Sequence, residues 1–107
     1  MPAVAAGTWK YNLTQVDTEI TNAISVGWNH VDTAHDYCED GSSGLSCKGS
    51  SVQVAVGEAI RGSKLERKQV FITTKVPGCG LQGVRYEHCA ADTKTIHQKN
   101  LDELQVD

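Results

Sequence analysis

The sequence predicts an α/β fold in which strands and helices alternate along the chain. Two apolar, β-branched segments, residues 30–34 and 70–76, have the composition of buried strands. Between them, apolar residues recur with the spacing of one helical face, at Val52, Ala55, Val56, Ala59 and Ile60. Strands that are joined through helices form parallel units with right-handed crossovers. We therefore expect a parallel sheet with helices packed against it.

The first strand and the first helix are expected near the N-terminus. Residues 4–9 form a short apolar run, and Thr14 with Asp17 three positions later has the pattern of a capping box. Gly27 stands where a left-handed residue would end the helix. The face expected to pack on the sheet is apolar and consists of Val16, Ile20, Ala23 and Ile24.

The rest of the chain is expected to form a loop, a helix, a strand and a helix. Residues 38–51 are rich in Gly, Ser and Asp, which predicts an exposed loop without regular structure, and the second helix should follow over residues 51–62. Residues 70–76 should be buried on both faces, as parallel sheets require. A more polar helix is expected over residues 86–104, with apolar contacts from Ile96, Leu101 and Leu104.

The composition argues against nucleic-acid and membrane partners. The chain has 107 residues, of which 39% are hydrophobic and 21% charged, with a formal net charge of −3 and no strong basic patch. It contains no apolar stretch of the roughly 18 residues that span a bilayer. The N-terminus also lacks a basic region followed by an apolar core, as in secretory signals. We therefore expect a cytoplasmic protein.

The cysteines Cys38, Cys47, Cys79 and Cys89 lie in or beside predicted loops. They form no Cys-x-x-Cys pattern, and no histidine pair has zinc-finger spacing, so no metal site is expected. Free thiols are the expectation for an intracellular chain. The alternative is a disulfide between Cys38 and Cys47, which would close their shared loop.

Ionisable residues follow two of the predicted strands. Asp32 lies near the end of the strand at residues 30–34 and Tyr37 in the loop after it, and Lys75 lies near the end of the strand at residues 70–76. A lone charge in a buried strand is costly unless it is paired, so Asp32 and Lys75 are expected to pair, with Tyr37 nearby. This pattern alone fits a structural ion pair as well as a catalytic group.

Four segments, in the same order, resemble the aldo-keto reductase family. Residues 1–10 are similar to its first strand, and His-Val-Asp-Thr-Ala-x-x-Tyr at residues 30–37 is similar to its second-strand signature. Residues 56–60 resemble the following helix, and Phe-Ile-Thr-Thr-Lys at residues 71–75 the lysine-bearing third strand. The resemblance implies a (β/α)8 barrel, of which residues 1–107 would hold the first three β/α units as the N-terminal portion of one oxidoreductase domain.

The resemblance also implies roles for the three ionisable residues. Tyr37 would be the general acid in carbonyl reduction and the base in oxidation. Lys75 would be the cation that tunes it, because a nearby positive charge stabilises the phenolate. Asp32 would be the carboxylate that holds Lys75 in place.

The same resemblance implies NADP(H) as the cofactor. Thr8, Trp9, Lys10 and Asp32 would contact it, and Trp9 and Tyr37 would line the pocket for an aldehyde or ketone substrate. Trp9 is alternatively a packed aromatic residue without such a role. The chain has no Gly-x-Gly-x-x-Gly fingerprint, so a Rossmann-type site is not supported.

The chain departs from the family pattern in two places. The family's catalytic histidine would lie beyond residue 107, and none of the four histidines of this chain occupies its motif position. Residues 38–49 intervene where the family passes quickly from its tyrosine to an Asn-Glu pair and a helix. This insertion could alter substrate access, or mark a mis-joined exon.

These departures leave more than one function open. Three strands cannot close a barrel that usually takes about 250 residues, so the fragment is expected to be inactive alone. The full-length parent is expected to be a monomer. The alternative is a catalytically dead remnant that acts, if at all, by associating with another chain that covers its open edges. An unrelated α/β binding module and a role like that of the potassium-channel β-subunits are further alternatives.

Overall fold

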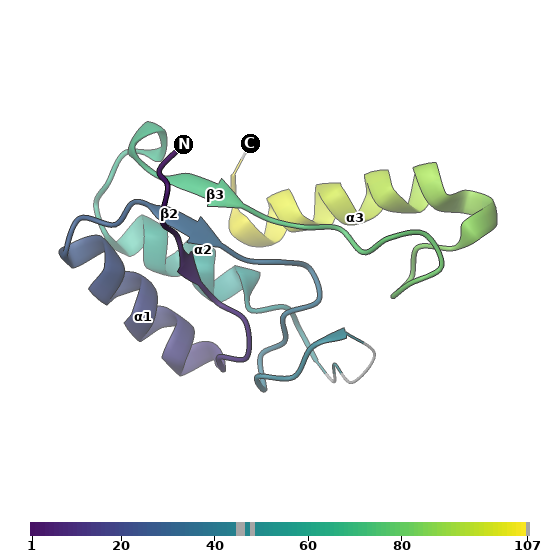
Figure 1. The fold of residues 1–107 in the computed structure, drawn as a ribbon, viewed down its shortest axis with the longest axis horizontal. Coiled ribbons are helices and arrows are strands. Elements are labelled where there is room, and N and C mark those ends of the chain that lie inside the picture. The colour runs from purple at the N-terminus through teal and green to yellow at the C-terminus, as the bar shows by residue number, and fades with distance from the viewer. Residues whose placement is uncertain (45–46, 48, 107) are drawn as a thin grey trace.

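A computed structural model describes residues 1–44, 47 and 49–106, and it has the expected alternation of strands and helices (Figure 1). In this described part, the strands β1 (Ala6–Gly7), β2 (His30–Asp32) and β3 (Phe71–Thr73) form a parallel sheet in the order β1-β2-β3. The helices are α1 (Leu13–Ser25), α2 (Gln53–Gly62) and α3 (Cys89–Leu104). Short 3₁₀ turns lie at Arg67–Gln69 and Tyr86–His88. None of the described helices is long and apolar enough to cross a membrane.

The strands occur where the sequence predicts them but are shorter than expected. Val31 of β2 is paired with Ala6 on one side and with Ile72 on the other. Single hydrogen bonds continue this pairing past the regular strands: His35 N donates to the Lys75 carbonyl at 3.1 Å. The chain thus stays aligned to Lys75 although the regular ladder has ended.

The core lies between the sheet and the helices α1 and α2, which lie next to each other in Figure 1. All five residues of the predicted α2 face are buried, and so are Val16 and Ile20 of α1. Ala23 and Ile24 are half-buried at the margin of α1. On α3, Ile96 and Leu104 are buried. Helical spacing therefore identified most of the core correctly.

The prediction that residues 70–76 are buried on both faces is wrong. Phe71 is 41% exposed, and Ile72 and Thr73 are only half-buried. Among the described residues, β3 has a neighbouring strand only on the β2 side. β3 is therefore an edge strand of the described sheet, and the exposure of Phe71 shows that no described layer fully covers that face of the strand.

The predicted start of the first helix also needs correction. Asn12, not Thr14, is the N-cap: its backbone is extended, and its side-chain oxygen accepts a hydrogen bond from Gln15 N at 3.0 Å. Gln15 Oε1 accepts in return from Asn12 N, which completes a capping box two residues earlier than expected. Gly27 has a φ of 91°, as predicted for the residue that ends this helix.

An ion pair joins Arg85, which precedes α3, to Asp92 in the first turn of that helix. The guanidinium of Arg85 donates two hydrogen bonds to Asp92, at 2.9 and 2.8 Å, and Arg85 N donates a third at 2.9 Å. These bonds from Arg85 hold the pKa of the Asp92 carboxyl well below its usual range. They also raise the pKa of Arg85.

The expectation of free thiols is wrong, because all four cysteines are paired. Cys38 is joined to Cys47 and Cys79 to Cys89, with Cα–Cα distances of 5.7 and 5.4 Å. The two cysteines of each pair are 9 and 10 positions apart in the sequence, so the chain must return on itself to bring them together. The sequence suggested the first pair only as the alternative and missed the second, because spacing alone does not reveal where a loop reverses.

We expect each disulfide to stabilise the fold. Replacing both cysteines of either pair with serine should lower the free energy of unfolding by about 2–3 kcal/mol, because the unfolded chain regains the entropy of an open loop. Denaturant unfolding of the two double variants measures this loss. Thiol titration of the unreduced, unfolded wild-type chain is the control, and detection of four free thiols would refute both pairings.

Gly57 allows the middle of α2 to approach the end of α3. A Cβ atom at this position would lie 2.5 Å from the Leu104 carbonyl oxygen, whereas a Cβ atom at Gly62 would meet nothing within 4 Å. We expect Gly57→Ala to destabilise the protein by about 1–3 kcal/mol, although alanine favours helix. Gly62→Ala is the matched control and should be neutral or stabilising by up to about 1 kcal/mol. Urea unfolding of the two variants measures both changes in stability. Equal changes for Gly57→Ala and Gly62→Ala would contradict the close approach of α2 to α3.

The Arg85–Asp92 pair should make stability depend on pH. The unfolded chain protonates Asp92 near the ordinary carboxyl pKa of about 4, whereas the folded chain keeps it ionised to lower pH. The stabilisation is therefore complete above about pH 4 and is lost as the pH falls toward the folded pKa. The difference in urea midpoint between wild type and Asp92→Asn should shrink below about pH 4. Asp17→Asn on the exposed side of α1 is the control, and a constant difference for Asp92→Asn would contradict this assignment.

Candidate active site

The parallel sheet brings the ends of all three strands to one edge. Thr8 follows β1, Asp32 is the last residue of β2, and Lys75 lies just beyond β3. Parallel strands end on the same side, and in (β/α) folds this is the edge that carries the site. The residues predicted to act together are therefore gathered by the direction of the strands.

Lys75 lies between Asp32 and Tyr37. Its ammonium Nζ is 2.5 Å from Asp32 Oδ1 and 2.8 Å from the Thr33 carbonyl oxygen, and it donates to both. The same atom lies 5.1 Å from the centre of the Tyr37 ring, within the range of a cation–π contact. The lysine and aspartate side chains are 42% and 37% exposed, so the pair is open to a ligand from solvent.

Tyr37 is held from two sides. Its ring is half-buried and packs against the hydrophobic core, and its backbone N–H donates to the Ala34 carbonyl at 3.2 Å. Its own carbonyl accepts from Val52 N at 2.8 Å, which ties it to the start of α2. The ring is thus placed by the core and by the backbone.

The three residues after β1 differ in their exposure. Thr8 is buried, and its hydroxyl donates to the Asp32 carbonyl at 3.2 Å. Trp9 is 56% exposed, and the ammonium of Lys10 lies 4.8 Å from the centre of its ring. The structure thus presents Trp9 and Lys10 at the surface of this edge, whereas the Thr8 hydroxyl is engaged inside.

The segment after Tyr37 is more ordered than its composition suggests. Cys38 N donates to the Ser42 carbonyl at 3.1 Å, and Tyr37 and Ser43 form an antiparallel bridge. The described residues of this segment form isolated bridges but no α-helix or strand, as predicted. The expected exposure is wrong at both ends of the segment, because Cys38 and Ser51 are buried. The predicted loop also includes residues 45, 46 and 48, which lie outside the described residues. Backbone hydrogen bonds, which composition does not encode, fold this turn back on itself.

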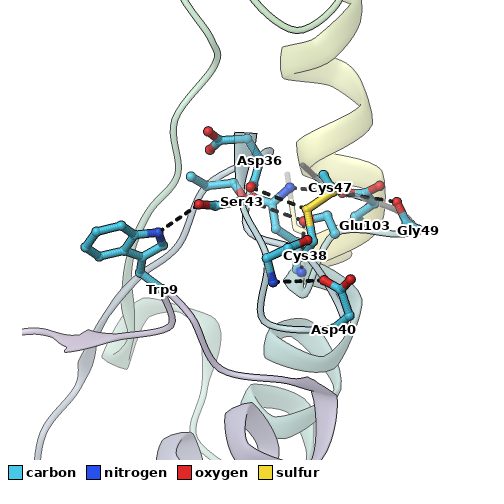
Figure 2. Close-up of a disulfide and its surroundings, with 12 residues drawn as sticks. Trp9, Asp36, Cys38, Asp40, Ser43, Cys47, Gly49 and Glu103 are labelled. Atoms are coloured by element: carbon cyan, nitrogen blue, oxygen red, sulfur yellow. Dashed lines mark hydrogen bonds between the residues drawn. A yellow bond between two sulfur atoms is a disulfide. The ribbon is translucent and has the colours of Figure 1, made fainter. Parts of the chain in front are cut away.

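This segment also reaches Trp9. The indole Nε1 of Trp9 donates to Ser43 Oγ at 3.2 Å, and Figure 2 shows this contact together with the disulfide that joins Cys38 to Cys47 in the same segment. Gly41 has a φ of 80°, and a Cβ atom there would lie 3.0 Å from the Lys10 carbonyl. Gly41 and Ser43 of this segment therefore pack closely against the chain after β1, and no sequence pattern identified Ser43 as a contact of Trp9.

Two buried amides behind Lys75 were missed by the sequence analysis. Gln53 and Asn100 are both fully buried and hydrogen-bonded to each other, with Gln53 Nε2 donating to Asn100 Oδ1 at 2.9 Å. The sequence does contain a signal for Asn100. This residue lies four residues after Ile96 and four before Leu104, which places a polar side chain on the apolar face of α3. A polar residue at such a position needs buried partners.

Other features of the described part do not coincide with this edge. A cavity of about 480 Å³ lies between α1 and α2 and includes Asp17, Glu39 and Glu58 in its lining, but none of the predicted site residues. Among the described residues, no group of three or more His, Cys, Asp or Glu side chains is placed to hold a metal ion. The convergence of Asp32 and Lys75 with Tyr37 therefore remains the candidate site.

Comparison with curated proteins finds relatives that are oxidoreductases by name. The chain is 31% identical over 107 residues to aldo-keto reductase family 1 member A1 of Rattus norvegicus. This match covers all of this chain and 28% of that protein. It is 32% identical over 79 residues to morphine 6-dehydrogenase of Pseudomonas putida, covering 74% of this chain and 22% of that protein. The chain thus spans less than a third of the length of these relatives.

Solved structures show the same likeness. A putative 2,5-diketo-D-gluconic acid reductase B superposes on the whole chain with a TM-score of 0.74 at 29% identity, over 31% of its own length. An aldo-keto reductase crystallised with NADPH superposes on the whole chain with a TM-score of 0.70 at 26% identity, over 30% of its length. The predicted fold class, the first three β/α units of a (β/α)8 barrel, is confirmed. Because the family model for aldo/keto reductases also matches residues 3–107, the chain belongs to the aldo/keto reductase family.

Proposed function

We propose that this chain carries the acid–base residues of an NADP(H)-dependent oxidoreductase that reduces an aldehyde or ketone to an alcohol. The observation that carries the proposal is the position of Lys75 Nζ, between Asp32 Oδ1 and the ring of Tyr37. Membership of the family supports the reaction class. The roles of the individual residues are part of the proposal.

The proposed chemistry uses a proton from Tyr37. In reduction, the Tyr37 hydroxyl donates its proton to the carbonyl oxygen of the substrate, and a phenolate remains. The nearby ammonium of Lys75 stabilises this phenolate by charge. Asp32 and the Thr33 carbonyl hold the ammonium by accepting its hydrogen bonds. In oxidation the phenolate accepts the proton back from the alcohol.

The exposed groups at this edge fit the nicotinamide half of NADP(H). Trp9 offers a flat apolar surface that is 56% exposed, and the carboxylate of Asp32 is open enough to accept from a sugar hydroxyl. Lys10 adds a positive charge beside Trp9. Thr8 fits less well, since its buried hydroxyl already donates to Asp32. When bound, the reduced cofactor supplies the hydride for the carbonyl carbon.

A second proposal is a catalytically inactive chain that associates with another polypeptide. The observation that favours it is the exposed edge strand β3, where Phe71 is 41% exposed. An uncovered strand edge is a template for pairing with another chain. That residues 1–107 are the N-terminal portion of one longer reductase domain, and that its parent is a monomer, remain predictions.

The cellular location is also a proposal. The expected cytoplasmic location remains a prediction, and the two disulfides weigh against it, because thiols are kept reduced in the cytosol of most organisms. An oxidising compartment would account for both pairings. Fractionation of the native source, with thiols blocked at lysis, distinguishes the two locations.

Tyr37→Phe should lower carbonyl reduction by about 10²–10⁴-fold in kcat and leave NADPH binding unchanged, because only the proton donor is removed. The assay uses the protein encoded by the complete transcript, with NADPH and an aromatic aldehyde, and NADPH binding is measured by fluorescence. Tyr86→Phe is the matched control, since Tyr86 is 79% exposed and lies outside the proposed site.

The outcomes separate the two proposals. Full activity in Tyr37→Phe would show that another group donates the proton. If the wild-type protein neither binds NADPH nor reduces any aldehyde or ketone tested, the inactive, associating chain is the better account.

A further inference from the structure

We infer that Asn100 is a positioning residue that sets the placement of Lys75 relative to the segment carrying Tyr37. The inference rests on the proposed function for its catalytic consequence, but the geometry stands on its own. Asn100 lies on α3, far from the exposed edge in sequence, and touches neither Asp32 nor Tyr37 in the hydrogen bonds described. It contacts the backbone of Lys75 on one side of the site and the side chain of His35 on the other.

One side of the Asn100 amide holds the end of β3. Its Nδ2 donates to the Lys75 carbonyl oxygen and to Thr74 Oγ1, each at 3.2 Å. The Lys75 carbonyl also accepts from His35 N at 3.1 Å. The backbone from which the Lys75 side chain departs is therefore bonded to α3 and to the segment after β2 at once.

The other side of the amide holds the segment that leads to Tyr37. Asn100 Oδ1 lies 3.0 Å from His35 Nδ1, two positions before Tyr37. Because Oδ1 can only accept, we assign the proton of this contact to Nδ1 of the imidazole. One side chain thus bridges the two segments that carry Lys75 and Tyr37.

The surroundings of Asn100 leave it little freedom. The side chain is fully buried, and its two donors and two acceptor positions are all used, since Gln53 Nε2 also donates to Oδ1 at 2.9 Å. Gln53 is fixed in turn: its Nε2 donates to Glu103 Oε2 at 2.9 Å, and its Oε1 accepts from Thr74 Oγ1. A fully satisfied buried network of this kind holds a single arrangement.

An apolar side chain would satisfy the packing of α3 more simply. Asn100 stands between Ile96 and Leu104, which are both buried on the same face. Burying an amide costs free energy unless its hydrogen bonds are made, so packing alone does not explain asparagine here. Holding two segments in register does explain it, because a shift of about 1 Å between reacting groups can cost about 100-fold in rate.

The first test needs no catalytic activity. Trace acetylation with acetic anhydride, read by mass spectrometry, gives the reactivity of Lys75 relative to that of the exposed Lys94 in the whole chain. We expect Asn100→Ala to raise the relative reactivity of Lys75 several-fold, since the ammonium would spend less time bound to Asp32 and Thr33. Asn100→Asp has nearly the same shape but loses both donations of Nδ2, to the Lys75 carbonyl and to Thr74 Oγ1, so it should show the same increase and serves if Asn100→Ala does not fold.

Two controls separate positioning from general loss of stability. Gln98→Ala removes an exposed amide from the same helix and should leave Lys75 unchanged. Gly57→Ala destabilises the packing of α2 on α3 without removing a hydrogen bond of Asn100 and should also leave it unchanged under native conditions. Unchanged Lys75 reactivity in a folded Asn100 variant overturns the inference.

The second test measures catalysis in the protein encoded by the complete transcript. Asn100→Asp should lower kcat by about 100-fold with little change in KM, because the misplaced groups are needed in the transition state. A rise in KM alone would contradict a positioning role. If Lys75 reactivity changes as expected but the wild type has no turnover, the positioning of Lys75 holds and the proposed function fails.

Discussion

Strand β2 pairs in parallel with β1 on one side and with β3 on the other, and every other feature of the site depends on this pairing. It sends the chain after each strand to the same edge, so that Asp32 meets Lys75 from a strand more than forty positions away. A shift in register by one residue would turn each side chain to the other face of the sheet and separate the pair. Helices α1 and α2 secure the register by burying Val31 in the core.

Polar contacts on both sides then fix the positions of the residues that the sheet brings together. Behind the edge, Asn100 and Gln53 form a buried network with Thr74 and His35. In front of it, the turn after Tyr37 is closed by a disulfide and carries Ser43 to the indole of Trp9. The exposed pair of Asp32 and Lys75 thus has a buried hydrogen-bond network on one side and a disulfide-bonded turn on the other. Neither support belongs to the pattern by which the family resemblance was found.

Sequence patterns predicted the elements better than their limits. The apolar face of α2 was correct at every position because helical spacing reports directly which side is buried. The pairing of Asp32 with Lys75 followed from the cost of an isolated charge near a buried strand. The start of α1 was misplaced because Asn12 and Gln15 form a capping box as readily as the pair proposed. The exposure of Phe71 was missed because it depends on whether another layer covers β3.

The sequence by itself determined the α/β order, the family and the three ionisable residues at the strand ends, because each depends on local composition and motif. Only the tertiary structure decided that Cys38 pairs with Cys47 and Cys79 with Cys89, since pairing requires two loops to reverse at the right places. It alone also showed that Asn100 bonds to both His35 and Lys75. Such contacts join residues 25 to 65 positions apart, and only the packing of α3 against the sheet brings them within hydrogen-bonding distance.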